Sequence, residues 1–246
     1  MPQSKAYSLE VCVDTADGLR ACQGRVDRIE LCSALSIGGL TPSAGLIEQA
    51  KDSVAAVHAM IRPRAGDFDF SPAEVDQMCR DIDCVRNAGL SGVVVGATKG
   101  AQLDVPALHA MRAAAGDLSL TLHRVIDILP DPIAAIETVI DLGFARILSS
   151  GGAHRAVEGV PHLRDMVMAA AGRIDIMAGS GVRAENVAQI ARATGIRSFH
   201  ASCSVQVPVS SVAAQFGFGG GTQAATSVTE IDAMRAALDE HFSSEP

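Results

Sequence analysis

The sequence predicts a single-domain (β/α)8 TIM barrel spanning residues 1–246, on three observations. Short apolar runs alternate eight times with segments of helical character. The length is close to the roughly 250 residues typical of this fold, and no Pro/Ser-rich linker divides the chain. A doubly wound open sheet is the alternative, but Asp14–Gly18 follows the first run where such folds often carry G-x-G-x-x-G. The barrel is therefore preferred.

The elements follow one another in the same order throughout. The runs predicted as strands are 8–13, 27–32, 54–61, 92–97, 118–124, 145–150, 174–179 and 198–202. The segments predicted as helices are 14–23, 43–52, 72–88, 105–114, 131–142, 157–171, 183–194 and 228–242. Cap residues support several of these bounds: Asp14 and Ser71-Pro72 at starts, and Gly89, Gly143 and Gly195 just past ends. Residues 205–246 are predicted as the last loop, with the glycine-rich segment 217–222, and the C-terminal helix.

Composition excludes several classes of protein. The net charge of −8 and the lack of a basic run argue against binding to nucleic acid or an anionic membrane. The apolar runs are shorter than the ~20 residues of a membrane span. Residues 1–8 lack the apolar core of a signal peptide, so we expect a cytoplasmic protein whose six scattered cysteines are free thiols. The oligomeric state stays open, a homo-oligomer included.

Alternation along the strands divides each run into two faces. Glu10 shares a face with Cys12, and Glu30 shares one with Cys32. The polar faces are expected to line the barrel interior, with Glu10, Glu30, His58, Arg62, His123 and His200 pointing into it. Buried charges are costly unless they are paired, so one interpretation is a structural network. The other is acid/base chemistry, with Glu10, Glu30 and His123 as candidate catalytic residues.

Arginines follow the third strand. Arg62 ends that strand and Arg64 begins the loop after it, on the side of a barrel where active sites lie. Guanidinium groups bind carboxylate or phosphate by forked hydrogen bonds, which predicts an anion site. The alternative is that both arginines pair with Asp67, Asp69 or Asp127 and shape the loop.

Glycine-rich turns follow the late strands at 149–154, 178–182 and 200–204. Gly179-Ser180-Gly181 directly precedes the predicted helix 183–194, a position where barrels often hold phosphate with backbone N–H groups. A tight turn that needs positive φ is an equally good interpretation.

Cys12 and Cys32 lie near the ends of the first and second strands, which are expected to be neighbours. Two thiolates there could bind a soft ion such as Cu(I). Buried cysteine is also a common small core residue, and this alternative stays open.

Together these motifs resemble the CutC family of copper homeostasis proteins over about residues 9–204. The stretches that carry the resemblance are RIELCSALSIGGLTPS (28–43), IRPRAGDFDFS (61–71), TLHRVID (121–127), ILSSGG (147–152) and IMAGSGVRAENV (176–187). The resemblance implies a cytosolic barrel that binds Cu(I) through Cys12 and Cys32 near its mouth. The positions that match family motifs are Glu10, Glu30, Arg62, Arg64, Asp67, His123, Arg124 and Asp127.

Two functions are therefore expected as alternatives. The first is copper homeostasis through Cu(I) binding. The second is an enzyme that acts by acid/base chemistry on a small anionic or phosphorylated metabolite. In that case the anion would be held by Arg62, Arg64, Arg124 and Gly179–Gly181, and the catalytic group would be Glu10, Glu30, His123 and Asp127.

Overall fold

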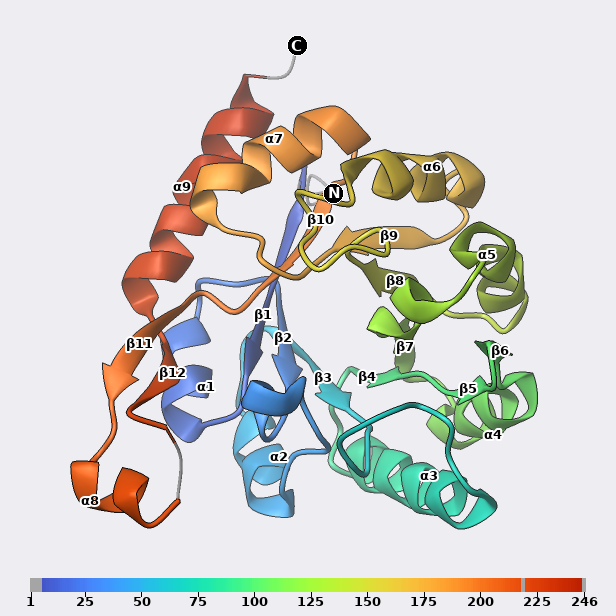
Figure 1. The fold of residues 1–246 in the computed structure, drawn as a ribbon, viewed down its shortest axis with the longest axis horizontal. Helices are drawn as coiled ribbons and strands as arrows, with labels where there is room; N and C mark the ends of the chain where they lie inside the picture. The colour runs from blue at the N-terminus through green and yellow to red at the C-terminus, as the bar shows by residue number, and fades with distance from the viewer. Residues whose placement is uncertain (1–5, 218–219, 245–246) are drawn as a thin grey trace.

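The protein forms a closed barrel of parallel strands, as the sequence predicts (Figure 1). The computed structural model describes residues 6–217 and 220–244. Around the barrel the strands follow the order β1-β2-β3-β4-β7-β8-β9-β10, and β10 pairs with β1. Their bounds are β1 Ser8–Val13, β2 Arg28–Leu31, β3 Ala56–Met60, β4 Gly92–Val95, β7 Ser119–Leu122, β8 Arg146–Ser149, β9 Asp175–Ala178 and β10 Ser198–Ala201.

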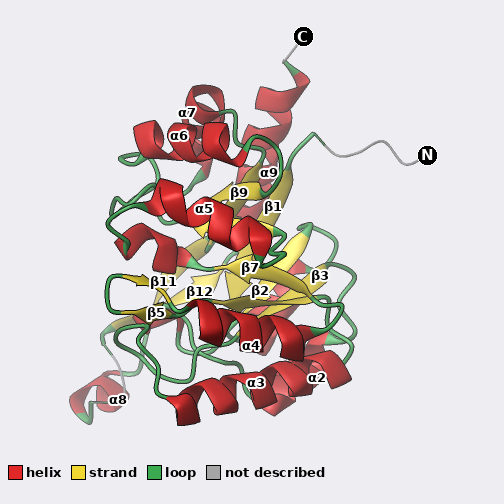
Figure 2. Cartoon of the chain, turned by 90° about the vertical axis from the view of Figure 1, so that its right-hand side faces the viewer, coloured by secondary structure: helices red, strands yellow, loops and turns green. Residues whose placement is uncertain are grey.

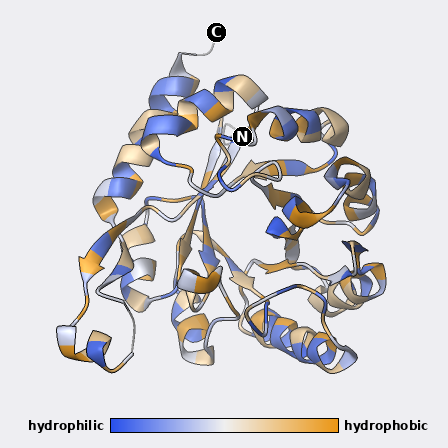
Figure 3. Ribbon diagram, viewed as in Figure 1, coloured by the Kyte–Doolittle hydropathy of each residue, from blue (hydrophilic) through white to orange (hydrophobic). Residues whose placement is uncertain are grey.

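Helices cover the outside of the barrel (Figure 2). Their bounds are α1 Ala16–Cys22, α2 Ala44–Ala50, α3 Pro72–Asn87, α4 Val105–Ala115, α5 Pro132–Asp141, α6 Val160–Ala170, α7 Ala184–Thr194 and α9 Val228–Ser243. The C-terminal helix α9 packs beside α7 (Figure 1). These helices carry hydrophobic and hydrophilic residues side by side (Figure 3), as expected for elements with one face on a core and one in solvent.

The helix bounds have local causes. Ser71 and Glu74 form a reciprocal capping box at the start of α3, where Pro72 occupies the first turn. Gly195 ends α7 in the left-handed region at φ 75°. The prediction that Asp14 caps α1 is wrong: Thr15 accepts the N–H of Gly18 instead.

Side chains that alternate along each barrel strand lie in two different environments, as expected. The outward-facing residues, such as Leu9, Val11 and Ile29, belong to one large apolar core that includes buried helix residues. The inward-facing residues form rows across the strands: Glu10 lies opposite Arg28 on β2 and opposite His200 on β10. The polar face of the strands therefore fills the barrel interior.

Several short elements are not predicted by the pattern of the sequence. The segment expected to be only a loop before α9 contains an antiparallel pair, β11 Ser204–Pro208 and β12 Thr222–Thr226, with α8 Ser211–Gln215 between them. Its strands are largely exposed and have no continuous apolar face, so they give little periodic signal. Within the predicted glycine-rich segment, residues 218–219 lie outside the described residues.

The remaining unpredicted elements are β5 Thr98–Lys99, β6 Gln102–Leu103 and two 3-10 turns, η1 Leu35–Ile37 and η2 Arg124–Ile128. Over the described ranges, no helix has both the length and the apolar character that crossing a membrane requires.

Candidate functional site

A cavity of about 340 Å³ opens at the carboxyl ends of the barrel strands. It is lined by Cys12, Glu30, Leu35, Gly38, Met60, Arg62, Phe68, His123, Arg124, Leu148, Ser180, Gly181, Val182, Arg183, His200, Ala201 and Ser202. Strand ends and βα loops from around the barrel contribute to this lining, which is the usual construction of a TIM-barrel active face. The cavity is therefore the candidate functional site.

Glu10 anchors a network of charges at the floor of the cavity. Its side chain has no exposed surface, and its carboxylate pairs with Arg28 and accepts a hydrogen bond from His200 Nδ1 at 2.7 Å. Burial would raise the pKa of Glu10, but Arg28 and His200 outweigh it and hold that pKa well below its usual range. Glu10 is thus a stably ionised carboxylate that orients the His200 ring.

Cys12, Glu30 and His200 form a group whose ligand atoms all lie within 4.8 Å of one another. They come from β1, β2 and β10, and closure of the barrel places β10 beside β1. Glu30 Oε1 has no hydrogen-bond partner in the described part of the chain. Burial raises the pKa of Glu30. For His200 burial opposes the charge, but Glu30, Cys12 and Glu10 together raise its pKa well above the usual range. A thiol, a carboxylate and an imidazole together are a ligand set for a metal ion.

Cys32 has a different environment from Cys12. It is fully buried, packs with Met60 and Val94 in a small apolar cluster, and lies with its sulfur 3.5 Å from Glu30 Oε2. Burial and the neighbouring Glu30 raise the pKa of this thiol well above its usual range. The structure thus groups Cys12 with His200 and Glu30, and it places Cys32 behind Glu30. The predicted pairing of Cys12 with Cys32 stays a prediction.

A lower layer of polar residues continues the network into the barrel. Arg146 bonds to Thr121 and pairs with Asp175, and burial lowers the pKa of His58 to about 3. Arg28, Arg146 and Asp175 are not among the residues predicted from the sequence to line the barrel. Alternation could have found Arg28, because it shares a strand face with Glu30.

The two loop arginines are largely occupied by partners within the chain. The terminal nitrogens of Arg62 donate to the carbonyls of Ile37, Gly39 and Gly66, which fold over the guanidinium, and only its Nε is left without a partner among the described residues. The anion fork expected at Arg62 is thus taken up by carbonyl groups.

Arg64 has internal partners as well. It pairs with Asp67, as the structural alternative expected, and with Glu74, which the sequence analysis did not consider for this role. Glu74 is the capping-box residue of α3, so its carboxylate stabilises the helix start and the loop together. Arg64 does not line the cavity.

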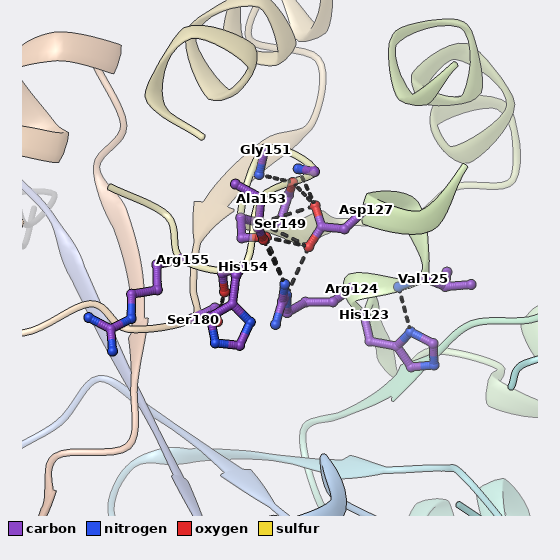
Figure 4. A network of polar contacts seen from close by, with 12 residues as sticks. His123, Arg124, Val125, Asp127, Ser149, Gly151, Ala153, His154, Arg155 and Ser180 are labelled. Atoms are coloured by element: carbon purple, nitrogen blue, oxygen red, sulfur yellow. Dashed lines mark hydrogen bonds and ion pairs between the residues drawn. The ribbon is translucent and has the colours of Figure 1, made fainter. Parts of the chain in front are cut away.

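Asp127 is a structural acceptor beneath the loop that follows β8 (Figure 4). Its carboxylate accepts hydrogen bonds from the backbone N–H groups of Ser150 and Gly152, from the hydroxyls of Ser149 and Ser150, and from Arg124 Nε. The glycine-rich turn 149–154, one of the predicted phosphate-binding turns, is therefore filled by a side chain of the protein. The catalytic role predicted for Asp127 receives no support from this placement.

The second predicted turn does line the cavity. Ser180 and Gly181 have positive φ values of 75° and 68°, and both are among the lining residues, whereas Gly179 donates its N–H to Ser149. The interpretation as a tight turn is confirmed, and the turn leads directly into the N-terminus of α7.

His123 lies at the cavity wall with its orientation fixed. Its Nδ1 accepts the N–H of Val125 at 3.1 Å (Figure 4), and its ring packs against Phe68 with centroids 4.8 Å apart. Burial, with the charge of Arg62, lowers the pKa of His123 to about 3. The imidazole is therefore neutral near pH 7.

Comparisons with known proteins identify the family of this chain and agree with its fold. The CutC family profile matches residues 7–205. A family protein CutC from Rhizobium meliloti (strain 1021) is 47% identical over 235 residues, which are 94% of this chain and 96% of that protein. One from Caulobacter vibrioides (strain NA1000 / CB15N) is 46% identical over 211 residues, covering 85% of this chain and 86% of its own.

Solved structures show the same fold. A Streptococcus agalactiae structure that bears the name copper homeostasis protein CutC has a TM-score of 0.77 at 32% identity, covering 80% of this chain and 98% of its own. Phosphoribosyl anthranilate isomerase from Thermococcus kodakaraensis, with a TM-score of 0.57 at 16% identity over 94% of this chain and 98% of its own, shares the fold alone. The extent of the family match and of the identity to the two bacterial relatives shows that this chain belongs to the CutC family.

Proposed function

We propose that this protein binds Cu(I) at the barrel mouth and serves copper homeostasis. The observation that carries the proposal is the convergence of Cys12, Glu30 and His200, whose ligand atoms lie within 4.8 Å of one another. The Streptococcus agalactiae relative, 32% identical, is named for copper homeostasis.

The donor set fits a soft ion in part. Cys12 supplies the thiolate that Cu(I) prefers, and His200 supplies an imidazole nitrogen. Because Glu10 accepts a hydrogen bond from Nδ1 of His200, the Nε2 atom of His200 is left to bind the metal. This arrangement is common around metal-bound histidines. Glu30 adds a carboxylate, which is a harder ligand and supports the ion mainly by its charge.

Cys32 is the second thiol of the proposal. Its sulfur lies 3.5 Å from Glu30 Oε2, and Cys32 is not among the residues that line the cavity. Two-thiol binding of Cu(I) by Cys12 and Cys32 therefore requires a local rearrangement that exposes the buried Cys32 thiol to the cavity. Cys12 then makes the first contact with an incoming ion, and Cys32 contributes after this rearrangement.

The experiment is an anaerobic Cu(I) titration in competition with a chromophoric chelator. Wild-type protein is expected to take up one ion, Cys12→Ser to lose this binding, and Cys32→Ser to weaken it. Cys84→Ser is the matched control, because Cys84 is an exposed thiol on α3. Full binding by a Cys12→Ser/Cys32→Ser double variant would refute the assignment.

The alternative function, an enzyme that acts by acid/base chemistry on a small anionic metabolite, stays a prediction. Binding of a small anion, which this alternative requires, is favoured by one feature. The cavity wall contains buried hydrogen-bond donors that the copper proposal does not use.

A further inference from the structure

The charged lining of the cavity is mostly cationic. Arg62, Arg124 and Arg183 line it together with the single carboxylate of Glu30, and the charge of Arg124 is paired with Asp127 behind the lining. The whole chain carries a net charge of −8, so this local excess of arginine runs against its average composition. A concave site that is lined by one sign of charge concentrates ligands of the opposite sign. The cavity wall is therefore suited to an anion.

Arg62 presents one buried donor that no group of the described chain uses. Its residue surface is 6% exposed, its terminal nitrogens are held by backbone carbonyls, and its Nε has no acceptor among the residues described. The guanidinium also lies over the ring of Phe68, 5.0 Å from the centroid. These contacts hold the guanidinium of Arg62, a residue that lines the cavity, in a fixed position.

His123 presents a second unused donor. It is 4% exposed, and its Nε2 has no partner within the described ranges. Because Nδ1 accepts the N–H of Val125, the proton of the neutral imidazole resides on Nε2. The Nε2–H group is thus a hydrogen-bond donor that needs no change of tautomer. Phe68 contacts both this ring and the guanidinium of Arg62, so the two side chains lie on the same side of the cavity.

Unsatisfied buried donors are rare in proteins, and each destabilises the folded state until a partner accepts its hydrogen bond. Two of them on residues that line one cavity mark a place where the oxygen atoms of a ligand can accept hydrogen bonds. A neutral imidazole N–H and a guanidinium N–H together supply one positive charge, which matches a carboxylate better than a phosphate dianion. The volume of about 340 Å³ lies at the lower end of small-molecule sites.

We propose that this cavity binds a small organic acid whose carboxylate accepts hydrogen bonds from His123 Nε2 and Arg62 Nε. The far end of the ligand lies toward Arg124, Arg183 and the turn Ser180–Gly181 at the start of α7, where the helix dipole also favours negative charge. This site uses none of the Cys12, Glu30 and His200 ligand atoms. It is therefore a second site, which the copper proposal neither requires nor explains.

The test uses the full chain, freed of metal by a chelator and dialysis, and isothermal titration calorimetry. The probes are acetate, succinate and 2-oxoglutarate, with succinamide as the uncharged analogue of succinate and inorganic phosphate as the competing anion. At least one of the three acids is expected to bind at one site per chain. Succinamide is expected not to bind, and phosphate to bind more weakly than that acid. Failure of all three acids to bind saturably would overturn the proposal, as would tighter binding of phosphate.

His123→Asn is the decisive variant. Its side-chain oxygen can still accept the N–H of Val125, but it lacks a donor at the position of Nε2, so affinity for the acid is expected to fall about tenfold. His123→Gln places an amide N–H near the Nε2 position and is expected to recover part of the loss. Unchanged affinity in His123→Asn would overturn the proposal.

Two further measurements separate binding from folding and from metal. The side-chain ¹⁵N–¹H signal of His123 Nε2 is expected to shift when the acid is added to the folded wild-type protein, and an unmoved signal at saturation would overturn the proposal. Cys12→Ser, which removes a proposed metal ligand but none of the donors that hold the acid, is expected to retain saturable binding of the acid. Loss of acid binding in Cys12→Ser, with retention in His123→Asn, would place the ligand on the metal group and overturn the second site.

Discussion

Asp127→Asn tests whether the carboxylate beneath the β8 loop is part of the scaffold. The substitution keeps the shape of the side chain, removes its charge and replaces one acceptor oxygen with an NH2 donor. A residue that acts only in catalysis would tolerate this change with little loss of stability. A residue that satisfies the loop 149–154 would not.

The magnitude follows from the contacts. Asp127 Oδ1 lies 3.1 Å from the nitrogen atoms of Ser150 and Gly152, and Oδ2 lies 3.0 Å from Ser150 N and 2.8 Å from Arg124 Nε. In either orientation of the amide, one of these donors loses its acceptor and Ser150 N–H faces a second donor. A lost partner costs about 1–3 kcal/mol, and the remaining bonds lose their charge assistance. Because Arg124 is 38% exposed and regains solvent, we expect a total of roughly 2–4 kcal/mol.

The assay is urea unfolding followed by circular dichroism, together with calorimetric melting. At ~2–4 °C per kcal/mol for a chain of this size, Tm should fall by roughly 4–16 °C. Asp117→Asn, an exposed position after α4, is the matched control and should change Tm by less than about 2 °C. An Asp127→Asn protein that melts within about 2 °C of wild type would refute the scaffold role.

Two further predictions concern the same loop and the cavity wall. Gly151→Ala should destabilise the protein far more than Gly172→Ala, although the two glycines have φ values of 71° and 72°. A Cβ on Gly151 would lie 2.3 Å from Gly159 O, whereas a Cβ on Gly172 would meet open space. Equal changes in the urea midpoint of the two variants would contradict the close approach of Gly151 to Gly159. Burial and Arg62 lower the pKa of His123 from 6.5 to about 3, so below about pH 6.5 the unfolded chain binds a proton that the folded chain does not. As the pH is lowered from 6 to 4, this group should therefore reduce the free energy of unfolding by up to about 1.4 kcal/mol per pH unit. The His123→Asn protein should show a shallower dependence on pH. Identical slopes for the two proteins would rule out the lowered pKa.

Much of the candidate site could be predicted because strand alternation is a local property. Glu10, Cys12, Glu30 and His200 were assigned to the interior from their spacing alone, and the structure buries Glu10, Cys12 and Glu30 there, with most of His200. The roles of single groups could not be predicted in this way. Arg64 pairs with Glu74 across the start of α3, a contact that depends on how the loop folds back.

The sequence by itself determined the repeated strand and helix units and the face of each strand that is polar. It also determined the end of the barrel where the candidate site lies. Each of these features depends on the order and spacing of neighbouring residues. Only the tertiary structure decided which groups meet. Cys12, Glu30 and His200 converge because closure places β10 beside β1, a neighbour relation between the two ends of the barrel. Asp127 fills the turn after β8, whereas Arg62 Nε and His123 Nε2 remain without acceptors, because hydrogen-bond saturation depends on three-dimensional distances that residue spacing does not encode.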